Sequence, residues 1–391
     1  MQAYEKFINY ALPYWDDTEI EGITDTIRSN WWSRGPKTAA FEERFAKSVG
    51  AKYAIAMNSC TAGLHIALMA HGIGEGDEVI VPDITFCASA NTVIHAGARP
   101  ILVDILEETG LIDPAAIEAA ITPKTKAIVP VHYSGQACDM EAIERIAKEH
   151  NLVIIEDAAH AVYTTYKGTP IGGLGHTASF SFYATKNLAT SEGGMLTTDN
   201  EEVANKARVL SLHGMSRNAW NRYAKGGSWF YEVEYAGYKY NMTDLQASLG
   251  LAQMDKLEKM QAIRDKYAKF YDKVIDGIEG IEHLKTMDYG RHAWHLYGIK
   301  IDETKLNINR DKFIEELTAL NIGTSVHFIP VHLHPLYRES FGYKQGDFPH
   351  AEHYFSQILS IPLYPSMTEG EINYVAEALQ FLAAKYAKCC G

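Results

Sequence analysis

Short apolar runs alternate with longer amphipathic stretches over residues 50–215. The apolar runs have the length of strands, and we predict strands over Tyr53–Met57, Glu78–Val81, Arg99–Val103, Ala127–Val131, Val153–Glu156, Ser179–Phe182 and Met195–Thr198. The stretches between them have helical spacing, and we predict helices over Ala62–Ala70, Pro114–Ala120, Met140–His150 and Glu201–Leu212. Strands that alternate with helices predict a mainly parallel sheet covered on both faces. Ligands of such folds bind beyond the carboxyl ends of the strands, so the residues that follow each strand are the candidates for chemistry.

The pattern changes after Thr243. Apolar residues then recur at helical intervals as far as about Ile275, which predicts one long helix or two joined helices. Further on we predict a strand over His295–Ile301, a helix over Arg310–Leu320, a strand-like run over Thr324–Phe328 and a final helix. The final helix begins with a capping box formed by Thr368 and Glu371.

The length of the chain, 391 residues, is enough for two domains of ordinary size. Hydrophobic residues make up 47% and charged residues 22%, which is typical of a globular protein. We therefore expect a large α/β domain over residues 12–250 and a smaller C-terminal α+β domain over residues 251–391. Residues 1–11 are expected to pack with the small domain.

The charge and cysteine content of the chain argue against several kinds of partner and site. The formal net charge of −13 argues against nucleic acid or an anionic membrane surface as the main partner. No apolar run reaches the roughly 18 residues of a membrane-spanning helix. The first residues are polar and aromatic rather than signal-like, and the 5 cysteines lack the spacing of a metal site or a disulfide framework. A reducing cytoplasm is the expected location, and no metal is expected.

Lys186 and Asp157 each stand at the end of a predicted strand. A lysine amine and a carboxylate are the minimal pair that holds pyridoxal phosphate (PLP), because the amine forms a Schiff base and the carboxylate pairs with the ring nitrogen. At about 4 Å and an effective dielectric of about 20, that attraction is roughly 4 kcal/mol. Such an attraction is worth about three pKa units, which keeps the ring nitrogen protonated at neutral pH.

Three further strand ends carry residues that suit the same cofactor. The segment Asn58–Gly63 opens a helix, whose backbone amides and Thr61 hydroxyl could bind phosphate. Phe86 could stack on a flat ring, and Ser181 could reach the phosphate. Each residue alone has a commoner explanation, such as a helix cap, a core side chain or a surface charge. Their joint occurrence at successive strand ends favours a cofactor site.

Motifs along nearly the whole chain resemble one family. The matching stretches are Ser33–Pro36, Phe41–Glu42, Asn58–Ala62, Asp77–Pro82, Pro130–Gln136, Ile155–Ala161, Phe180–Gly194 and Gly237–Met242. In these stretches the chain resembles the PLP-dependent sugar aminotransferases of the DegT/DnrJ/EryC1 group. The resemblance implies fold-type I, with a mainly parallel central sheet in the large domain and a smaller α+β domain.

The resemblance also implies roles for individual residues. Lys186 is implied as the Schiff-base lysine and proton shuttle, and Asp157 as the partner of the ring nitrogen. His160 falls where the family places a group beside the phenolic oxygen of the cofactor. The implied stacking aromatic is Phe86, and the implied phosphate ligands are Thr61, Ala62 and Ser181.

The stretch Gly237–Asn241 departs from the usual family pattern, Gly-Tyr-Asn-Tyr-Arg. Lys239 stands where asparagine is usual, and Asn241 stands where arginine is usual. In many members this loop completes the phosphate site of the neighbouring subunit, so a homodimer with shared active sites is implied. The variant resembles the branch that acts on 4-keto nucleotide sugars, such as the 4-amino-4-deoxy-arabinose enzymes. Either Lys239 or Asn241 could be the phosphate donor.

The resemblance implies transfer of an amino group from L-glutamate, released as 2-oxoglutarate, to a nucleotide-linked keto-deoxysugar, with C4 as the expected keto position. The alternatives are a 3-keto sugar or a related PLP reaction, and a PLP-binding regulator without turnover. Lys186 argues against the sugar dehydratases of this fold, which carry histidine there. No Gly-x-Gly-x-x-Gly follows the first strand, which argues against a dinucleotide dehydrogenase. Small-domain histidines that could contact substrate are His295, His327, His332 and His334.

Overall fold

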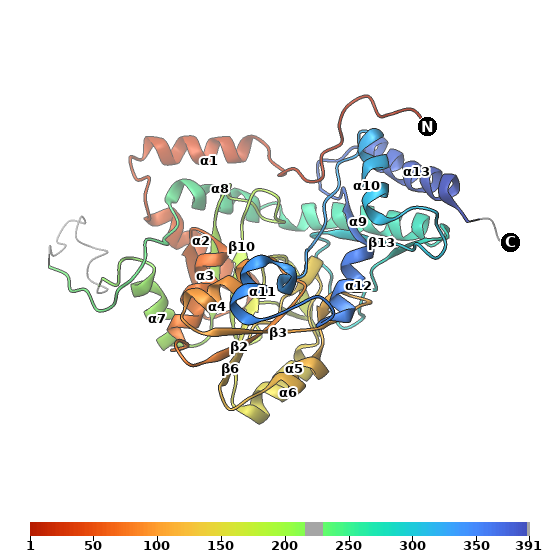
Figure 1. Ribbon diagram of the computed structural model, residues 1–391. Coiled ribbons are helices and arrows are strands. Elements are labelled where there is room, and N and C mark those ends of the chain that lie inside the picture. Colours follow the sequence, from red (N-terminus) through yellow and green to blue (C-terminus); the bar gives the residue numbers. More distant parts are fainter. Residues whose placement is uncertain (216–229, 389–391) are drawn as a thin grey trace.

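The computed structural model of the chain describes residues 1–215 and 230–388 (Figure 1). Its helices are α1 Asp17–Arg28, α2 Pro36–Val49, α3 Cys60–Ala70, α4 Ala88–His95, α5 Pro114–Ala120, α6 Met140–His150, α7 Glu201–Leu210, α8 Asp244–Met254, α9 Leu257–Ile275, α10 Arg310–Ala319, α11 Pro335–Phe341, α12 Pro349–Gln357 and α13 Glu369–Tyr386. Its strands are β1 Tyr53–Met57, β2 Glu78–Pro82, β3 Arg99–Val103, β4 Ile105–Leu106, β5 Leu111–Ile112, β6 Thr125–Ile128, β7 Val153–Asp157, β8 Thr165–Tyr166, β9 Thr169–Pro170, β10 Thr177–Ser181, β11 Gly194–Thr198, β12 Ile281–His283, β13 Tyr297–Ile301 and β14 Ile358–Ile361.

The central sheet has 7 strands in the order β1-β11-β10-β7-β6-β2-β3. The five strands from β10 to β3 run parallel, and only β11 is antiparallel to both of its neighbours. The mainly parallel sheet predicted from the sequence is therefore confirmed. Parallel strands are covered on both faces and read as continuous apolar runs, which is why each strand of this sheet was visible in the hydrophobic pattern.

The helices around the central sheet pack against its strands and against one another. Helix α3 contacts α4, α7 and the strands β10 and β11, while α5 and α6 contact each other. Figure 1 shows α5 and α6 together at the lower edge of the view, with α1 and α8 side by side at the top. Among the described helices, none is both long enough and apolar enough to cross a bilayer.

A second, antiparallel sheet has the order β12-β13-β14. Side chains from α9, α10 and α13, such as Tyr271, Phe313 and Leu379, form its own hydrophobic core. Ile8 belongs to the same core and pairs with Ile322, so the first residues of the chain lie against this part of the protein. Figure 1 accordingly shows the N-terminus near α13, where the Tyr374 hydroxyl donates to the Gln2 carbonyl at 2.8 Å.

Part of the C-terminal sequence packs with the large sheet instead. Tyr337 and Tyr354 belong to the large hydrophobic core, and the Tyr337 hydroxyl donates a hydrogen bond of 2.6 Å to Asn91 Oδ1. In Figure 1, α11 accordingly lies over the large sheet rather than beside α13. The expected division of the chain near residue 250 stays a prediction.

Some details of the predicted secondary structure were wrong. The run Thr324–Phe328 forms only an isolated bridge between Ser325 and Ser360 rather than a strand. Two residues later the His327 carbonyl accepts a hydrogen bond of 2.6 Å from the Tyr133 hydroxyl rather than from a neighbouring strand. Strand β6 begins at Thr125 and ends at Ile128, earlier than predicted. The predicted helix from Thr243 is two joined helices, α8 and α9.

Candidate active site

The carboxyl ends of the sheet strands bring the candidate residues to one edge. In the strand register, Met57 of β1 and Ser181 of β10 both lie opposite Gly194. Ser179 lies opposite Asp157, the last residue of β7. Because these ends are aligned, the residues that follow each strand converge on one region, as expected for this fold class.

Asp157 is a buried carboxylate held by hydrogen-bond donors. Its Oδ2 accepts from the Ser89 hydroxyl at 2.6 Å, and its Oδ1 accepts from the Ala159 N–H at 3.1 Å and from the Cys60 thiol at 3.9 Å. Among the described residues it forms no ion pair. Burial raises the pKa of Asp157, and the Ser89 hydrogen bond opposes that rise. The charge of Lys186 also lowers this pKa, but without an ion pair. A buried anion without a direct ion-pair partner is costly, so this position suits a cationic ring nitrogen.

Lys186 lies in the turn that follows β10. Its backbone N–H donates to the Tyr183 carbonyl at 2.9 Å, and its amine lies 3.4 Å from Nε2 of His295. Burial lowers the pKa of the Lys186 amine to about 8, although the nearby Cys60 and Asp157 raise it. Only the neutral amine is a nucleophile, and this lowered pKa makes a useful fraction of it available near neutral pH.

His160 is a buried and neutral hydrogen-bond donor. The Ser134 N–H donates to its Nδ1 at 3.2 Å, so the ring proton of the neutral imidazole resides on Nε2. Burial, together with the charge of Lys186, holds the pKa of His160 well below its ordinary value. Its ring stacks on that of Phe328 at an interplanar angle of 20°.

The small-domain histidines divide into those near Lys186 and those away from it. His295 touches the Lys186 amine, and Nδ1 of His327 lies 2.9 Å from the Ser360 hydroxyl. Burial lowers the pKa of His327 to about 3, with the charge of Lys186 adding to the effect. His332 is buried between Asp83 and Glu352 and so has a structural partner on each side. His334 precedes α11 and takes the position of its N-cap.

The predicted phosphate ligands surround the start of α3. The Ala62 N–H donates at 3.0 Å to the hydroxyl of Ser59, which caps this helix. The protein itself therefore already supplies an acceptor to that amide. The Thr61 hydroxyl makes no hydrogen bond within the described part of the chain. Ser181 is buried, and within the described residues its hydroxyl accepts one long hydrogen bond, of 3.4 Å, from the Tyr183 N–H.

Phe86 follows β2 and is 58% exposed. Its ring centroid lies 6.0 Å from that of Phe328. It is not the core side chain that an isolated phenylalanine after a strand would usually be, so its face is available to stack on a flat ring.

The loop that carries Lys239 and Asn241 docks at the end of β1. The Asn58 N–H donates to the Tyr240 carbonyl at 2.7 Å, and Met57 pairs with Asn241. The Lys239 amine donates at 2.6 Å to Oδ1 of Asn241. The amide nitrogen of Asn241 donates to the Met242 carbonyl at 3.0 Å. The two candidate phosphate donors thus form one hydrogen-bonded pair, with Lys239 exposed and Asn241 buried.

The structure adds site residues that the sequence pattern did not single out. Ser89 binds Asp157 and also contacts the Thr85 hydroxyl at 2.7 Å. Asn187 accepts from His295, and Ser134 contacts His160. The available signals were weak: Asn187 directly follows the lysine, and Ser89 stands one helical turn after Thr85.

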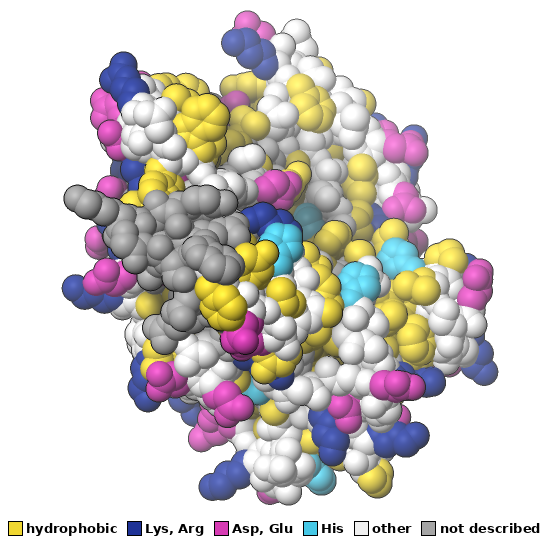
Figure 2. Space-filling model, turned by 90° about the vertical axis from the view of Figure 1, so that its left-hand side faces the viewer, with side chains coloured by type: hydrophobic (Ala, Val, Ile, Leu, Met, Phe, Trp, Pro, Cys, Tyr) yellow, Lys and Arg dark blue, Asp and Glu magenta, His cyan; other side chains and the backbone are white. Residues whose placement is uncertain are grey.

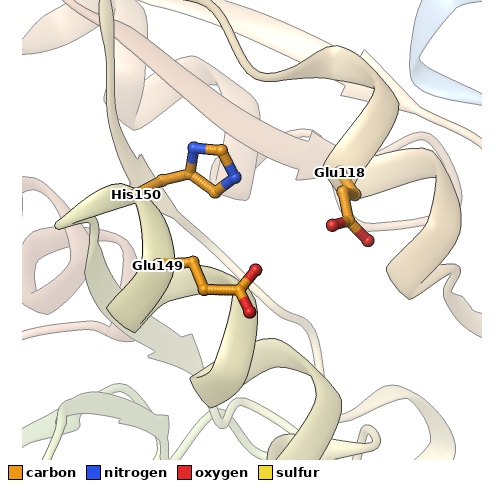
Figure 3. A group of neighbouring side chains, drawn as sticks. All are labelled: Glu118, Glu149 and His150. Atoms are coloured by element: carbon orange, nitrogen blue, oxygen red, sulfur yellow. The ribbon is translucent and has the colours of Figure 1, made fainter.

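One group of side chains has the spacing of metal ligands but does not form a convincing metal site. Glu118, Glu149 and His150 are exposed and offer ligand atoms within 4.8 Å of one another (Figure 3). The Arg145 guanidinium lies 3.6 Å from Glu118 and 3.3 Å from Glu149. The two carboxylates therefore already have a cation between them.

Comparison with solved structures supports the same fold. The PLP form of Spr1654 from Streptococcus pneumoniae superposes with a TM-score of 0.90 at 33% identity, over 97% of this chain and 99% of that one. PseC of Helicobacter pylori, an aminotransferase involved in the biosynthesis of pseudoaminic acid, superposes with a TM-score of 0.90 at 26% identity, over 98% of this chain and 100% of that one. The expected fold class, that of fold-type I PLP-dependent transferases, is confirmed.

Sequence comparison assigns the family. The spore coat polysaccharide biosynthesis protein SpsC of Bacillus subtilis (strain 168) is 55% identical over 381 residues, which cover 97% of this chain and 98% of that relative. The model of the DegT/DnrJ/EryC1/StrS aminotransferase family matches residues 13–380. The chain therefore belongs to the DegT/DnrJ/EryC1/StrS aminotransferase family.

Proposed function

We propose that the protein is a PLP-dependent sugar aminotransferase that moves an amino group from L-glutamate to the keto carbon of a nucleotide-linked deoxysugar. The observation that carries the proposal is a buried Asp157, which forms no ion pair among the described residues, near the Lys186 amine at one edge of the sheet. An anion that lacks a cation suits a pyridinium, and an amine with a pKa of about 8 suits an aldehyde.

When bound, PLP supplies an aldehyde that condenses with amines and a ring that withdraws electrons from the reacting carbon. Asp157 would hold the proton on the ring nitrogen, because its carboxylate forms no ion pair among the described residues and feels the charge of Lys186 only without direct contact. Lys186 would move a proton to and from the reacting carbon. His160 presents its Nε2 proton as a donor, which suits the phenolic oxygen of the cofactor.

The phosphate would lie at the start of α3. The Thr61 and Ser181 hydroxyls are the side-chain donors there, and the α3 N-terminus favours an anion. The Ala62 amide would have to share its proton with Ser59. Phe86 would cover one face of the ring.

We also propose a second copy of the chain as a partner that completes each site. The Lys239–Asn241 pair lies on an exposed loop, and large aromatic side chains such as Trp32, Phe86 and Tyr183 are about half exposed. Figure 2 shows patches of hydrophobic side chains on one face of the molecule. Of the two candidate phosphate donors, Lys239 is the better one, because it is positively charged and exposed, whereas Asn241 is neutral and buried.

The sugar is the part of the proposal that rests on relatives. SpsC is described as a polysaccharide biosynthesis protein, and PseC as an aminotransferase in the biosynthesis of pseudoaminic acid. Both descriptions support a sugar as the acceptor, and the keto group is part of our proposal. We propose C4 as the keto position from the resemblance of the Gly237–Asn241 stretch, with a 3-keto sugar as the alternative.

The test uses the full chain reconstituted with PLP. L-glutamate is added alone, and 2-oxoglutarate release is measured in a single turnover. A panel of 3-keto and 4-keto sugar nucleotides then follows, with product NMR to locate the new amine. We expect one equivalent of 2-oxoglutarate per site and turnover with a 4-keto substrate.

The matched variants are Lys186→Ala and Lys52→Ala, because Lys52 is an exposed lysine at the start of β1, on the far edge of the sheet. Lys186→Ala should abolish turnover, and Lys52→Ala should retain it. Full transamination by Lys186→Ala, or no visible absorbance from bound PLP in the wild type, would refute the proposal. Turnover restricted to 3-keto sugars would refute only the C4 assignment.

A further inference from the structure

The Lys186 amine has a specific neighbour that lies 109 positions away in the sequence. Its Nζ is 3.4 Å from Nε2 of His295, which comes just before β13. The His295 backbone is fixed, because its N–H donates to the Ser134 carbonyl at 3.0 Å. The imidazole thus reaches the lysine from a rigid segment.

Asn187 determines which nitrogen of His295 carries the proton. The Asn187 side-chain nitrogen donates to the Ala293 carbonyl at 2.7 Å, and this contact fixes the orientation of the amide. Its oxygen therefore faces Nδ1 of His295, at 3.2 Å, and accepts the proton that Nδ1 carries. A neutral imidazole has one donor and one acceptor nitrogen. Nε2 is consequently an acceptor, and its lone pair faces the Lys186 amine.

The neighbours of His295 keep the ring neutral. The ionisable side chains that act on it are Lys186, His160, His327 and Arg264, and all of them are basic. The His160 ring is in contact, with its centroid 4.4 Å from that of His295. Burial, and then the charge of Lys186, hold the pKa of His295 well below its ordinary value. A protonated His295 would point an N–H at the amine. Both the geometry and the surrounding charges therefore favour neutral His295, with Nε2 as a hydrogen-bond acceptor.

We propose that Asn187 and His295 form a positioning pair that holds the free amine of Lys186 through one N–H···Nε2 hydrogen bond. Asn187 sets the tautomer, and His295 supplies the acceptor. With one N–H anchored, the amine cannot rotate freely about its last side-chain bond, so its remaining atoms keep a constant direction between turnovers. The inference deepens the proposed function, because it rests on Lys186 being the reactive amine.

The primary test needs no cofactor and no substrate. Trace acetylation of the apoprotein across pH, followed by peptide mass spectrometry, gives the pKa of the Lys186 amine, with the exposed Lys52 as internal reference. The variants are His295→Phe, which removes the acceptor, His295→Gln, which restores an acceptor oxygen, and Asn187→Leu, which leaves the imidazole in place but frees its tautomer.

An acceptor stabilises the ammonium form more than the neutral amine, so losing it should lower the pKa. We expect His295→Phe and Asn187→Leu to lower the pKa of Lys186 by about one unit, a change of about tenfold in the protonation equilibrium. His295→Gln should restore most of the wild-type value. In the reconstituted protein, His295→Phe and Asn187→Leu should lower kcat and leave the KM for L-glutamate nearly unchanged.

An unchanged Lys186 pKa in Asn187→Leu would overturn the proposal, and that variant decides the test even if His295→Phe does not fold. A drop in His295→Gln as large as that in His295→Phe would also overturn it, because it would show that the acceptor is irrelevant. Failure of the proposed function would look different. In that case Lys186→Ala would still bind PLP, and borohydride reduction would link the PLP to another lysine. This result would not depend on the pKa measured in the apoprotein.

Discussion

Asp157 illustrates the conflict between burial and charge at a single residue. Its carboxylate is only 4% exposed, and among the described residues its stabilising contacts are hydrogen bonds rather than an ion pair. A site that awaits a cationic ligand is expected to be least stable when the ligand is absent. Asp157 therefore couples the stability of the protein to cofactor binding.

Asp157→Asn should make the apoprotein more stable and should lower its affinity for PLP. We expect the apoprotein's unfolding free energy at pH 8 to rise by about 1–3 kcal/mol, because an uncompensated buried charge is removed. The affinity for PLP should fall by about 10²- to 10³-fold, since the neutral amide gives up most of an attraction of roughly 4 kcal/mol. Denaturation of wild type and variant, with and without PLP, measures both the stability of the apoprotein and the stabilisation by PLP. A variant apoprotein that is less stable than wild type would contradict this account.

The pH dependence of the apoprotein follows from the same residue. Because the pKa of Asp157 is raised above its ordinary value of 3.8, the folded apoprotein holds this proton more tightly than the unfolded chain does. Its contribution to stability is present below that ordinary value and is lost as the pH rises through the raised pKa. The stability difference between Asp157→Asn and wild type should therefore grow with rising pH across this window and stay constant above it.

Ser89→Ala tests the strongest donor to the carboxylate. Removing the 2.6 Å hydrogen bond should raise the pKa of Asp157 further, because that bond stabilises its charged form. We expect a loss of about 1–3 kcal/mol in PLP binding at neutral pH, typical of a hydrogen bond to a buried charge. Ser48→Ala is the control, because its hydroxyl binds only the Phe45 carbonyl at a helix end. Equal PLP affinities in the two variants would contradict the role given to Ser89.

Among the helices, α2 depends on a residue from another helix for its start. Its N-cap is Gly35, which has no side chain to accept the first N–H groups. Asp244 of α8 accepts from the Gly35, Lys37 and Thr38 N–H groups at 2.8, 3.0 and 2.9 Å. It also accepts from the Thr38 hydroxyl at 2.6 Å. One buried carboxylate thus joins the starts of two helices.

Asp244→Ala should therefore cost more than an ordinary cap. We expect about 2–4 kcal/mol of unfolding free energy, because several buried donors lose their partner at once. Asp244→Asn keeps one acceptor oxygen and should lose less than half as much. Chemical denaturation of the three proteins provides the comparison. Equal losses in the two variants would show that the charge, rather than the set of acceptors, is what stabilises α2.

The sequence predicted elements that bury continuous apolar surface and missed those that do not. Each strand of the central sheet was predicted, whereas the short strands Ile281–His283 and Ile358–Ile361 were missed; the first of them has only three residues. The Thr324–Phe328 run has strand-like composition but finds only one backbone partner. Whether a segment forms a strand depends on the neighbouring strand that it pairs with, and the composition of the segment does not reveal that neighbour.

The same limit applied to the site. Lys186 and Asp157 were predictable because each stands at the end of its own strand. Their hydrogen-bond partners were not, because Ser89 reaches Asp157 across 68 positions and His295 reaches Asn187 across 108. Only the fold brings these pairs together, and the roles proposed for them stay predictions.

For the molecule as a whole, His332 links the C-terminal segment to the central sheet. Its Nδ1 lies 2.6 Å from Asp83, which follows β2, and its Nε2 lies 3.1 Å from Glu352 of α12. Burial by itself would lower the pKa of His332, but Asp83 and Glu352 outweigh it and raise the pKa. The Asp83 backbone carbonyl also accepts from the Val331 N–H at 2.9 Å, so the contact fixes the chain as well as the side chain.

His332→Ala should lower the unfolding free energy by about 3–5 kcal/mol, because it leaves Asp83 buried and unpaired. The contribution of His332 should be fully present below its ordinary pKa of 6.5 and be lost as the pH rises through the raised value. The wild-type advantage over His332→Gln should therefore shrink as the pH rises from 6.5 through the raised pKa. His353→Gln, on the surface beside Glu107, is the control and should show little change. An advantage that grows with pH would contradict the assignment.

Mapping the lysine that bonds to PLP tests the central claim most directly. Borohydride reduction of the reconstituted full chain fixes the link, and peptide mass spectrometry then locates the modified residue. The account predicts one phosphopyridoxyl group per chain, on Lys186, and its loss in Lys186→Ala. A label on any other lysine, or no label on a protein that has taken up PLP, would contradict it.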